Sequence, residues 1–209
     1  MNLPERRKLV VALQAELAAC TRCPAMGKPV VMGQPVPSPV LMIGQAPGDK
    51  EPLAGKPFAW TAGRNLFKWF GSIGLDEEAF RSRVYMAAVC RCFPGKNPKG
   101  GDRVPSPVEI AACAPWLERE LTLCRPELII PVGKLAIARF MDEAPLVDTI
   151  GKAHAWKHGR RTVDVIPLPH PSGASTWYHV EPGKTLTRQA LALIEQHPAW
   201  QKLRALASG

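Results

Sequence analysis

The sequence predicts an α/β fold of three layers, in which helices cover both faces of a central, mostly parallel sheet of four strands. Short apolar runs alternate with amphipathic helical patterns along the chain, which is typical of parallel sheets buried on both faces. Several of these runs end in loops rich in glycine or proline, where ligands of such sheets bind. The 209 residues suffice for one sizeable core, so we expect a single domain over residues 1–209.

Four short apolar runs are the strand candidates: residues 39–44, 83–90, 126–133 and 162–170. Helical patterns precede, separate and follow them. Residues 5–19 carry an apolar stripe at helical spacing, formed by Leu9, Val10, Leu13 and Leu17.

The later helices are indicated by their first turns. Thr61 can cap a helix whose apolar face holds Leu66, Trp69, Phe70 and Ile73. Ser106 and Glu109 have the spacing of a capping box, with proline at the first helical position. Pro115 should kink or restart the helix that they open. Residues 184–196 are expected to form the last helix.

Basic residues outnumber acidic ones. The 27 lysines and arginines against 18 aspartates and glutamates give a net charge of +9, which favours an anionic partner, with nucleic acid as the first candidate. Basic side chains gather in residues 81–103, where Asp102 is the one acid, and in residues 151–161. These segments are either solvated loops or a surface that follows phosphates, whose binding would weaken steeply with salt.

Six cysteines in a chain without a signal-peptide pattern are better explained as metal ligands or free thiols than as disulfides. Cys20 and Cys23 form a C-x2-C pair after the first helix. With Cys92 and Cys113 they would make a four-thiolate site, for which spacing alone admits zinc or an iron–sulfur cluster. The remaining two are expected to be buried apolar thiols: Cys90 and Cys124.

Two loops that leave strands carry candidate chemistry. The first, G-Q-A-P-G-D-K-E over residues 44–51, places Asp49 and Glu51 at the strand end, and Phe58 follows in a second Gly/Pro-shaped turn. Taken alone, it could be a solvated turn, and the phenylalanine could be core or could stack on a planar base. The second, H-P-S-G from His170, holds a histidine between prolines, either as a structural group or as a donor to developing negative charge.

Taken in order, these motifs resemble the uracil-DNA glycosylase superfamily, most closely its iron–sulfur families 4 and 5. The early C-x2-C, the G-Q-A-P-G loop, G-K-P-F with A-G beyond it, Cys92 with Asn97, I-A-A-C-A-P-W-L-E-R-E-L, P-E-L-I-I-P-V-G-K-L-A and H-P-S-G match that family's signatures in sequence. The resemblance covers about residues 17–176. It implies an α/β/α fold, removal of uracil from DNA, and a [4Fe–4S] cluster on Cys20, Cys23, Cys92 and Cys113.

The resemblance also assigns roles at the two loops. Phe58 would stack on a base flipped out of DNA, and the backbone around Gln45, Ala46 and Gly48 would hold its carbonyl edge. His170 would stabilise the departing uracil anion, and one carboxylate, Asp49 or Glu51, would position water. The expected DNA contacts are Pro171, Ser172, Gly173 and Lys134. Residues 173–178 would press into the duplex.

The chain departs from the family patterns at two positions. Gln45 replaces the glutamate of the family 4 loop, so that the loop begins like the G-Q-D-P-Y of family 1. Ala88 stands where the family asparagine reads the uracil edge. Residues 99–101 look like an insertion. We therefore identify the chain as a divergent member.

Several functions remain open at this point. The first expectation is a monomeric uracil-DNA glycosylase, cytoplasmic, acting at the bacterial nucleoid on single- or double-stranded DNA, with no membrane partner. A glycosylase for hypoxanthine or xanthine is one alternative, and a catalytically weak iron–sulfur DNA-binding protein is another. An electron carrier would fit the basic segments less well than a DNA-binding protein does.

Overall fold

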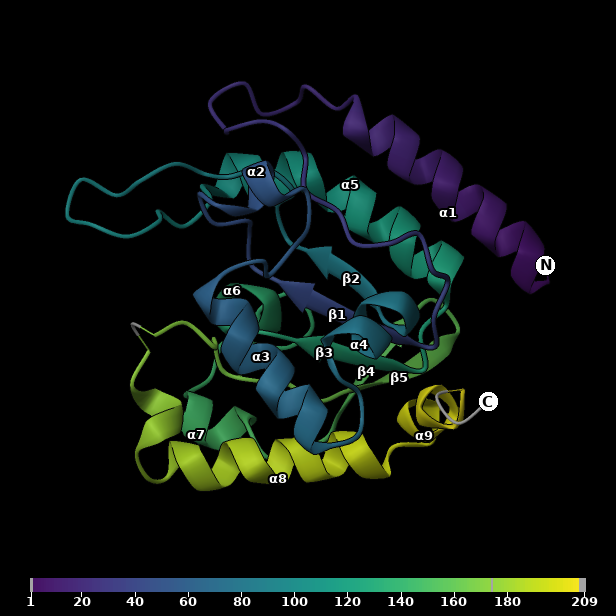
Figure 1. Cartoon of the computed structure of the whole chain (residues 1–209), viewed down its shortest axis with the longest axis vertical. Coiled ribbons are helices and arrows are strands. Elements are labelled where there is room, and N and C mark those ends of the chain that lie inside the picture. Colours follow the sequence, from purple (N-terminus) through teal and green to yellow (C-terminus); the bar gives the residue numbers. More distant parts are fainter. Residues whose placement is uncertain (1, 174, 207–209) are drawn as a thin grey trace.

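The computed structural model describes residues 2–173 and 175–206 (Figure 1). Their centre is a five-stranded sheet in the order β2-β1-β3-β5-β4. The strands are β1 (Val40–Gly44), β2 (Tyr85–Ala88), β3 (Leu128–Pro131), β4 (His154–His158) and β5 (Arg161–Val165). β1 pairs in parallel with β2 and β3, and β3 pairs in parallel with β5. The α/β class and the mostly parallel sheet are thus confirmed.

The fifth strand, β4, is a departure from the expected four. It runs antiparallel to β5 and closes a hairpin through Gly159, whose φ is 60°. Residues 151–161 were expected to be a solvated loop or a phosphate-following surface, because their polar composition hides the strand. β4 lies at the sheet edge and alternates half-buried with exposed residues, so only Trp156 contributes a large apolar group. An edge strand with one face exposed to solvent can form without a continuous run of apolar residues.

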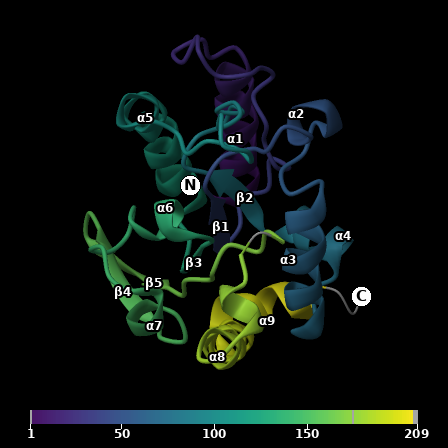
Figure 2. The same ribbon diagram turned by 90° about the vertical axis from the view of Figure 1, so that its left-hand side faces the viewer.

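Helices cover both faces of the sheet, and Figure 2 shows the two layers from the side. On one face, α1 (Leu3–Ala18) and α5 (Pro107–Cys124) pack on Leu41, Ile43 and Ile129. The other face is covered by α3 (Thr61–Ser72), α4 (Glu77–Arg83), α8 (Gly183–Gln196) and α9 (Pro198–Ala205). Shorter helical turns lie in the connections: α2 (Glu51–Ala54), α6 (Lys134–Ile137), α7 (Leu146–Thr149) and the 3-10 turn Trp177–His179.

The alternation of buried side chains explains the layers. Successive strand residues point to opposite faces, so Val40 and Met42 join one core cluster while Leu41 and Ile43 join the other. Every residue of β1 is buried, as expected for a central strand covered on both sides.

Helix ends agree only in part with the sequence. Ser106 and Glu109 do form a capping box, and Pro107 follows as the first residue of α5. The expected cap at Thr61 is wrong, because Trp60 takes the cap position and no side chain bonds there. α5 runs without interruption through Pro115, so the helix does not restart there.

Two other helices differ from expectation. Leu9, expected in the apolar stripe of α1, is 45% exposed, whereas Gln14 is buried and donates to the Gly33 carbonyl. α9 was not expected, and it buries Trp200 against the α3–α4 layer. Within the described part of the chain, none of the helices is long and apolar enough to cross a membrane.

Candidate active site

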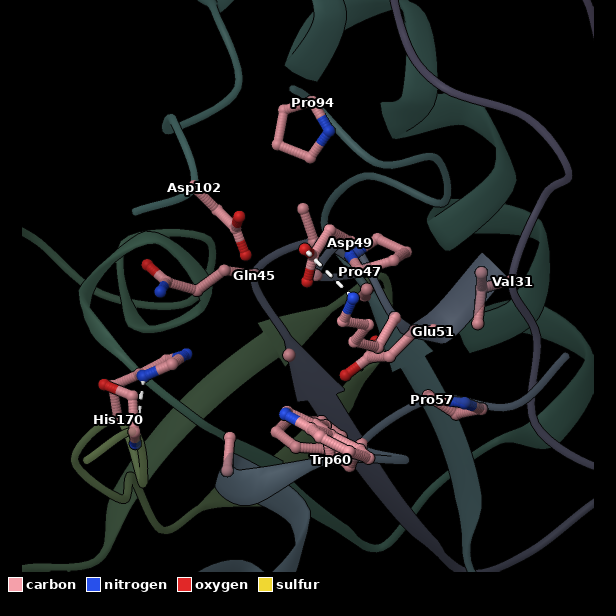
Figure 3. A pocket seen from close by; sticks show the side chains of 18 of the residues that line it. Val31, Gln45, Pro47, Asp49, Glu51, Pro57, Trp60, Pro94, Asp102 and His170 are labelled. Atoms are coloured by element: carbon pink, nitrogen blue, oxygen red, sulfur yellow. Dashed lines mark hydrogen bonds and ion pairs between the residues drawn. The ribbon is translucent and has the colours of Figure 1, made fainter. Parts of the chain in front are cut away.

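A cavity of about 480 Å³ opens where β1 and β2 end (Figure 3). Its size is that of an ordinary small-molecule site. It brings together eight predicted site residues, from the two loops and from the end of β2: Gln45, Ala46, Gly48, Asp49, Glu51, Phe58, Ala88 and His170. Of the four predicted DNA contacts, Ser172 also lines it. The two loop exits therefore meet around one space.

Gln45 and His170 lie side by side at the end of β3. A Cβ atom placed on Gly133 would lie 3.1 Å from both the Gln45 Cδ and the His170 Cδ2, so a larger residue there would crowd the pair. The Gln45 Oε1 accepts a hydrogen bond from the Leu135 backbone N–H at 3.3 Å. Because the Gln45 oxygen already accepts a hydrogen bond from the protein, the amide nitrogen is the group of this side chain that can donate to a ligand.

His170 is a neutral hydrogen-bond donor in this setting. Burial lowers its pKa, which keeps the ring uncharged near neutral pH. The Ser172 backbone N–H donates to Nδ1 at 3.3 Å, so Nδ1 acts as the acceptor and the proton resides on Nε2. Figure 3 shows the ring beside Gln45 and across the cavity from Glu51.

Phe58 is held in a strained backbone conformation. Its φ is 52°, a left-handed value that costs a non-glycine residue about 1–2 kcal/mol. Arg81 stabilises the turn by donating to the Pro57 carbonyl at 2.8 Å and to the Phe58 carbonyl at 3.1 Å. Gly63 makes room for it, because a Cβ there would lie 1.8 Å from the Phe58 oxygen. Strain supported in this way is typical of a functional position.

The two candidate carboxylates have different surroundings. Glu51 is half-buried, and burial raises the pKa of its carboxyl to about 7, although the backbone of Phe58 and of Gly48 acts in the opposite direction. Asp49 is more exposed, and its hydrogen bond from Lys96 lowers its pKa. Asp49 is therefore anionic and already paired at neutral pH, whereas Glu51 titrates there.

The segment of residues 93–105, which we call the outer wall, encloses the cavity on the side opposite α3. Pro94, Asp102 and Val104 contribute to the lining. Lys96 bridges Asp49 at 3.0 Å and Asp102 at 2.7 Å, so it ties the outer wall to the first loop. The wall contains residues 99–101, the segment that looks like an insertion in the sequence.

The predicted DNA contacts divide into exposed and buried groups. Gly173 and Lys134 are exposed, but neither lines the cavity, and Pro171 is buried. The Pro171 carbonyl accepts from the Asn65 side-chain amide at 3.0 Å, which anchors the loop after His170.

Residues 173–178 were expected to press into a duplex, and this prediction is wrong for Tyr178. Its ring is buried and packs edge-on against Trp69, with centroids 5.0 Å apart. Its hydroxyl is bonded to the loop that holds His170. Within residues 173–178, position 174 lies outside the described residues.

Sequence reasoning missed several residues of the site. Trp60 lines the cavity and is 57% exposed, Arg81 supports Phe58, and Lys96 ties the outer wall. Asp102 also lines the cavity, and its sequence signal is that it is the single acidic residue in the basic segment 81–103. No local pattern indicates the reach of Arg81, because its partners lie more than twenty residues away in the sequence.

The four cysteines proposed as ligands line a second, small cavity beside the end of α1. Cys20 and Cys23 are half-buried, and Cys92 and Cys113 are buried. Burial, and then the nearby thiolates of Cys113 and Cys20, raise the pKa of Cys23, so the sulfur atoms are close enough to repel one another when charged. Four converging thiols suit a soft, thiolate-bound group.

The spacing of these thiols bears on which group they can hold. Among the described residues, no set of three or more His, Cys, Asp or Glu side chains is arranged to hold one metal ion. Four thiolates as a donor set suit either zinc or an iron–sulfur cluster. As expected, two buried thiols lie outside this set of four: Cys90 and Cys124.

Comparison with known proteins decides the family. The family model described as "Uracil DNA glycosylase superfamily" matches residues 31–194. This chain belongs to the uracil-DNA glycosylase superfamily. The match spans the sheet, both site loops and most of α8, so the whole candidate active site lies inside the superfamily domain.

The relatives of this superfamily member carry two type names. It is 28% identical over 171 residues to the type-4 uracil-DNA glycosylase of Sulfurisphaera tokodaii, covering 78% of this chain and 74% of the relative. It is 29% identical over 172 residues to the type-4 enzyme of Thermotoga maritima, covering 80% and 83%. It is also 29% identical over 204 residues to the type-5 enzyme of Thermus thermophilus, covering 82% and 86%. Identity this low agrees with a divergent member.

Proposed function

We propose that this protein removes uracil from DNA by hydrolysing the bond between the base and its deoxyribose, leaving an abasic site. One observation carries the proposal: in a member of this superfamily, Gln45, Glu51, Phe58 and His170 converge on one cavity large enough for a flipped nucleobase. The net charge of +9 supports DNA as the partner.

The cavity offers a stacking surface and a polar edge. The Phe58 ring lies against the end of β1, about 3.0 Å from where a Gly44 Cβ would stand, and would stack on the face of the base. The Gln45 amide nitrogen, and backbone N–H groups near Ala46, would donate to carbonyl oxygens of the base. Phe58 does not need to move to do this, because Arg81 already fixes its backbone.

His170 would act on the departing base. When the glycosidic bond breaks, its electron pair stays on the base, and negative charge develops on the uracil carbonyl oxygen. The His170 Nε2–H would donate a hydrogen bond to that oxygen. A single such donor, fixed in advance, supplies on the order of 3–4 kcal/mol. Ser172 holds the ring in the required tautomer through its backbone N–H.

Glu51, rather than Asp49, would act on the sugar side. The deoxyribose becomes positively charged as the base leaves, and a nearby carboxylate offsets that charge and orients a water molecule for attack on C1′. Glu51 faces the cavity with its charge unpaired by any lysine or arginine within salt-bridge distance in the described structure, whereas Asp49 pairs with Lys96 and Lys50. Its raised pKa of about 7 predicts a rate that increases as the pH rises through 7.

The four cysteines would hold a [4Fe–4S] cluster. When bound, this group supplies a cross-link among the end of α1, the segment after β2, and α5. Cys20 and Cys23 tether the first of these, Cys92 the second and Cys113 the third. The test is an assay of iron and acid-labile sulfide in protein purified without chelators, with Cys124→Ala as the matched cysteine control.

The remaining parts of the proposal concern the surroundings of the site. Lys134, Ser172 and Gly173 would contact DNA phosphates beside the flipped nucleotide, and Pro171 would shape their loop. We propose one domain, acting as a monomer in the cytoplasm. Whether single- or double-stranded DNA is preferred follows from the same assay with both substrates.

The deciding experiment measures free base released from oligonucleotides that contain one uracil. We expect release by the wild-type protein, and His170→Ala should slow it at least about tenfold, a conservative part of what one donor supplies. The control is His197→Asn, which keeps a capping side chain at the start of α9, far from the cavity. Equal rates for wild type and His170→Ala would remove the histidine from the mechanism.

A second substrate class is favoured by Ala88. It lines the cavity but has no amide to read a base edge, so the described side chains select uracil less strictly than an asparagine would. Oligonucleotides with hypoxanthine or xanthine in the same sequence test this. Release of these bases at rates near that of uracil would support a broader glycosylase.

A further inference from the structure

Arg91 lies between the two cavities and lines both of them. Its side chain is only 2% exposed. It stands between the cysteines at positions 90 and 92, in the segment that leaves β2. A guanidinium is costly to bury, so its position requires a set of partners that satisfy it.

Those partners connect Ala88 to a helix. Ala88 lines the cavity proposed to hold the base, which we call the base pocket, and we call this residue the pocket floor. The Arg91 Nε donates to the Ala88 carbonyl at 3.0 Å, and its guanidinium pairs with the fully buried carboxylate of Glu120 on α5. The Tyr85 hydroxyl donates to the other Glu120 oxygen at 2.7 Å. The charge pair is thus hydrogen-bonded at both ends, as a stable buried pair must be.

The same residue reaches the cysteine cavity, which it lines together with Cys113 and the other three proposed ligands. Cys113 and Glu120 stand two turns apart on α5, so one face of this helix carries both the thiol and the carboxylate.

The segment that Arg91 anchors is also bonded to the first loop of the base pocket. The Val89 N–H donates to the Gly44 carbonyl and the Cys90 N–H donates to the Gln45 carbonyl, both at 3.0 Å. A shift of residues 88–92 would therefore move Gln45 as well as the pocket floor. No other described arginine or lysine lines both cavities.

We propose that Arg91 is a positioning residue that couples the two cavities: by tying the Ala88 carbonyl to Glu120 on α5, it makes the geometry of the base pocket depend on the packing of the cysteine-bearing helix. This inference rests on the proposed function of the pocket. Arg91 does not touch the base. It fixes the backbone on which Gln45 and the pocket floor depend.

The test compares hydrogen exchange and base release. Replacing both charges in Arg91→Met/Glu120→Gln leaves no unpaired buried charge, so the chain should fold. We expect exchange at the Val89 and Cys90 amides to accelerate at least tenfold. We also expect the single-turnover rate of uracil release to fall about tenfold, with less change in KM. Arg119→Met, which breaks the exposed pair with Glu16 on the same helix, is the control and should change neither.

Two more variants separate positioning from a general loss of packing. Arg91→Lys should give intermediate values, because an ammonium can serve one partner but lacks the fork that serves two. Cys113→Ala should also accelerate exchange at Val89 and Cys90, whereas Cys124→Ala, a buried thiol on the same helix, should not.

The outcomes decide the proposal clearly. Wild-type protection of Val89 and Cys90 in Arg91→Met/Glu120→Gln would overturn the positioning role, and wild-type protection in Cys113→Ala would overturn the coupling. If the wild-type protein releases no uracil, the proposed function fails, while the exchange measurements still test the anchoring of residues 88–92.

Discussion

The two walls of the base pocket are held by different kinds of contact. The inner wall, which we define as residues 44–63, is fixed by backbone hydrogen bonds to the segment after β2, by Arg81, and by the close approach of Gly63. The outer wall is tied to it by Lys96, whose side chain is 55% exposed.

The difference indicates which wall positions the catalytic groups and which wall accommodates the DNA. Contacts that are shielded from water keep their strength in salt, whereas exposed ion pairs are screened and contribute little. The inner wall holds Phe58 and Glu51, and it should be rigid before substrate arrives. The outer wall can yield without disturbing the chemistry, so we expect it to affect how DNA fits more than how fast the bond breaks.

Glu51→Gln should have the largest effect, because it removes the charge that the inner wall presents to the sugar. We expect base release to fall at least about 100-fold, in the range for one acid–base group. The pH dependence through about 7 should disappear with it. A pH–rate profile of single-turnover release checks both, and a variant that keeps the wild-type profile would exclude Glu51 as the titrating group.

The same substitution should stabilise the fold at high pH. Burial raises the pKa of Glu51, so the folded state favours the protonated carboxyl, and stability is lost as the pH rises from the unfolded value of 4.5 through about 7. The uncharged amide escapes this loss. We expect Glu51→Gln to gain at most about 3 kcal/mol at pH 8 and little at pH 4, measured by urea unfolding at both pH values.

Gly63→Ala tests whether the inner wall is rigid. A Cβ there would overlap the Phe58 carbonyl, so the turn must shift by an ångström or more. A displacement of that size can cost about 100-fold in rate, and strain of this kind costs on the order of 1–3 kcal/mol of stability. Gly71→Ala, on the same helix with open space around it, is the matched control. A Gly63→Ala enzyme of wild-type rate would show that the wall adapts.

Arg81→Met should have a smaller effect, about tenfold on base release, since it removes two hydrogen bonds to the strained turn but adds no clash. Its exposed partner Glu77 provides the comparison. Glu77→Gln breaks the ion pair and leaves both bonds from Arg81 to the turn, so it should retain nearly all activity. If both variants lose activity equally, the ion pair rather than the turn contacts is responsible.

The sequence predicts the parts of this site that follow from local pattern. The apolar runs identify the four strands covered by helices, and the motifs after them identify Gln45, Glu51, Phe58 and His170 because each lies in a segment that leaves a strand. What it misses depends on distant contacts. β4 has no apolar run because it lies at the solvent-exposed edge of the sheet. Arg81 and Arg91 contact partners that are distant in sequence and become neighbours only in the folded chain.

Lys96→Met should have the smallest effect on chemistry. It opens the exposed ties to Asp49 and Asp102, so the outer wall loosens while Glu51 and Phe58 stay in place. We expect the single-turnover rate to change less than about threefold, and the change to shrink further in high salt, where such pairs are screened. KM for DNA should carry most of the difference. A large, salt-independent fall in the single-turnover rate would show that the outer wall, too, positions catalytic groups.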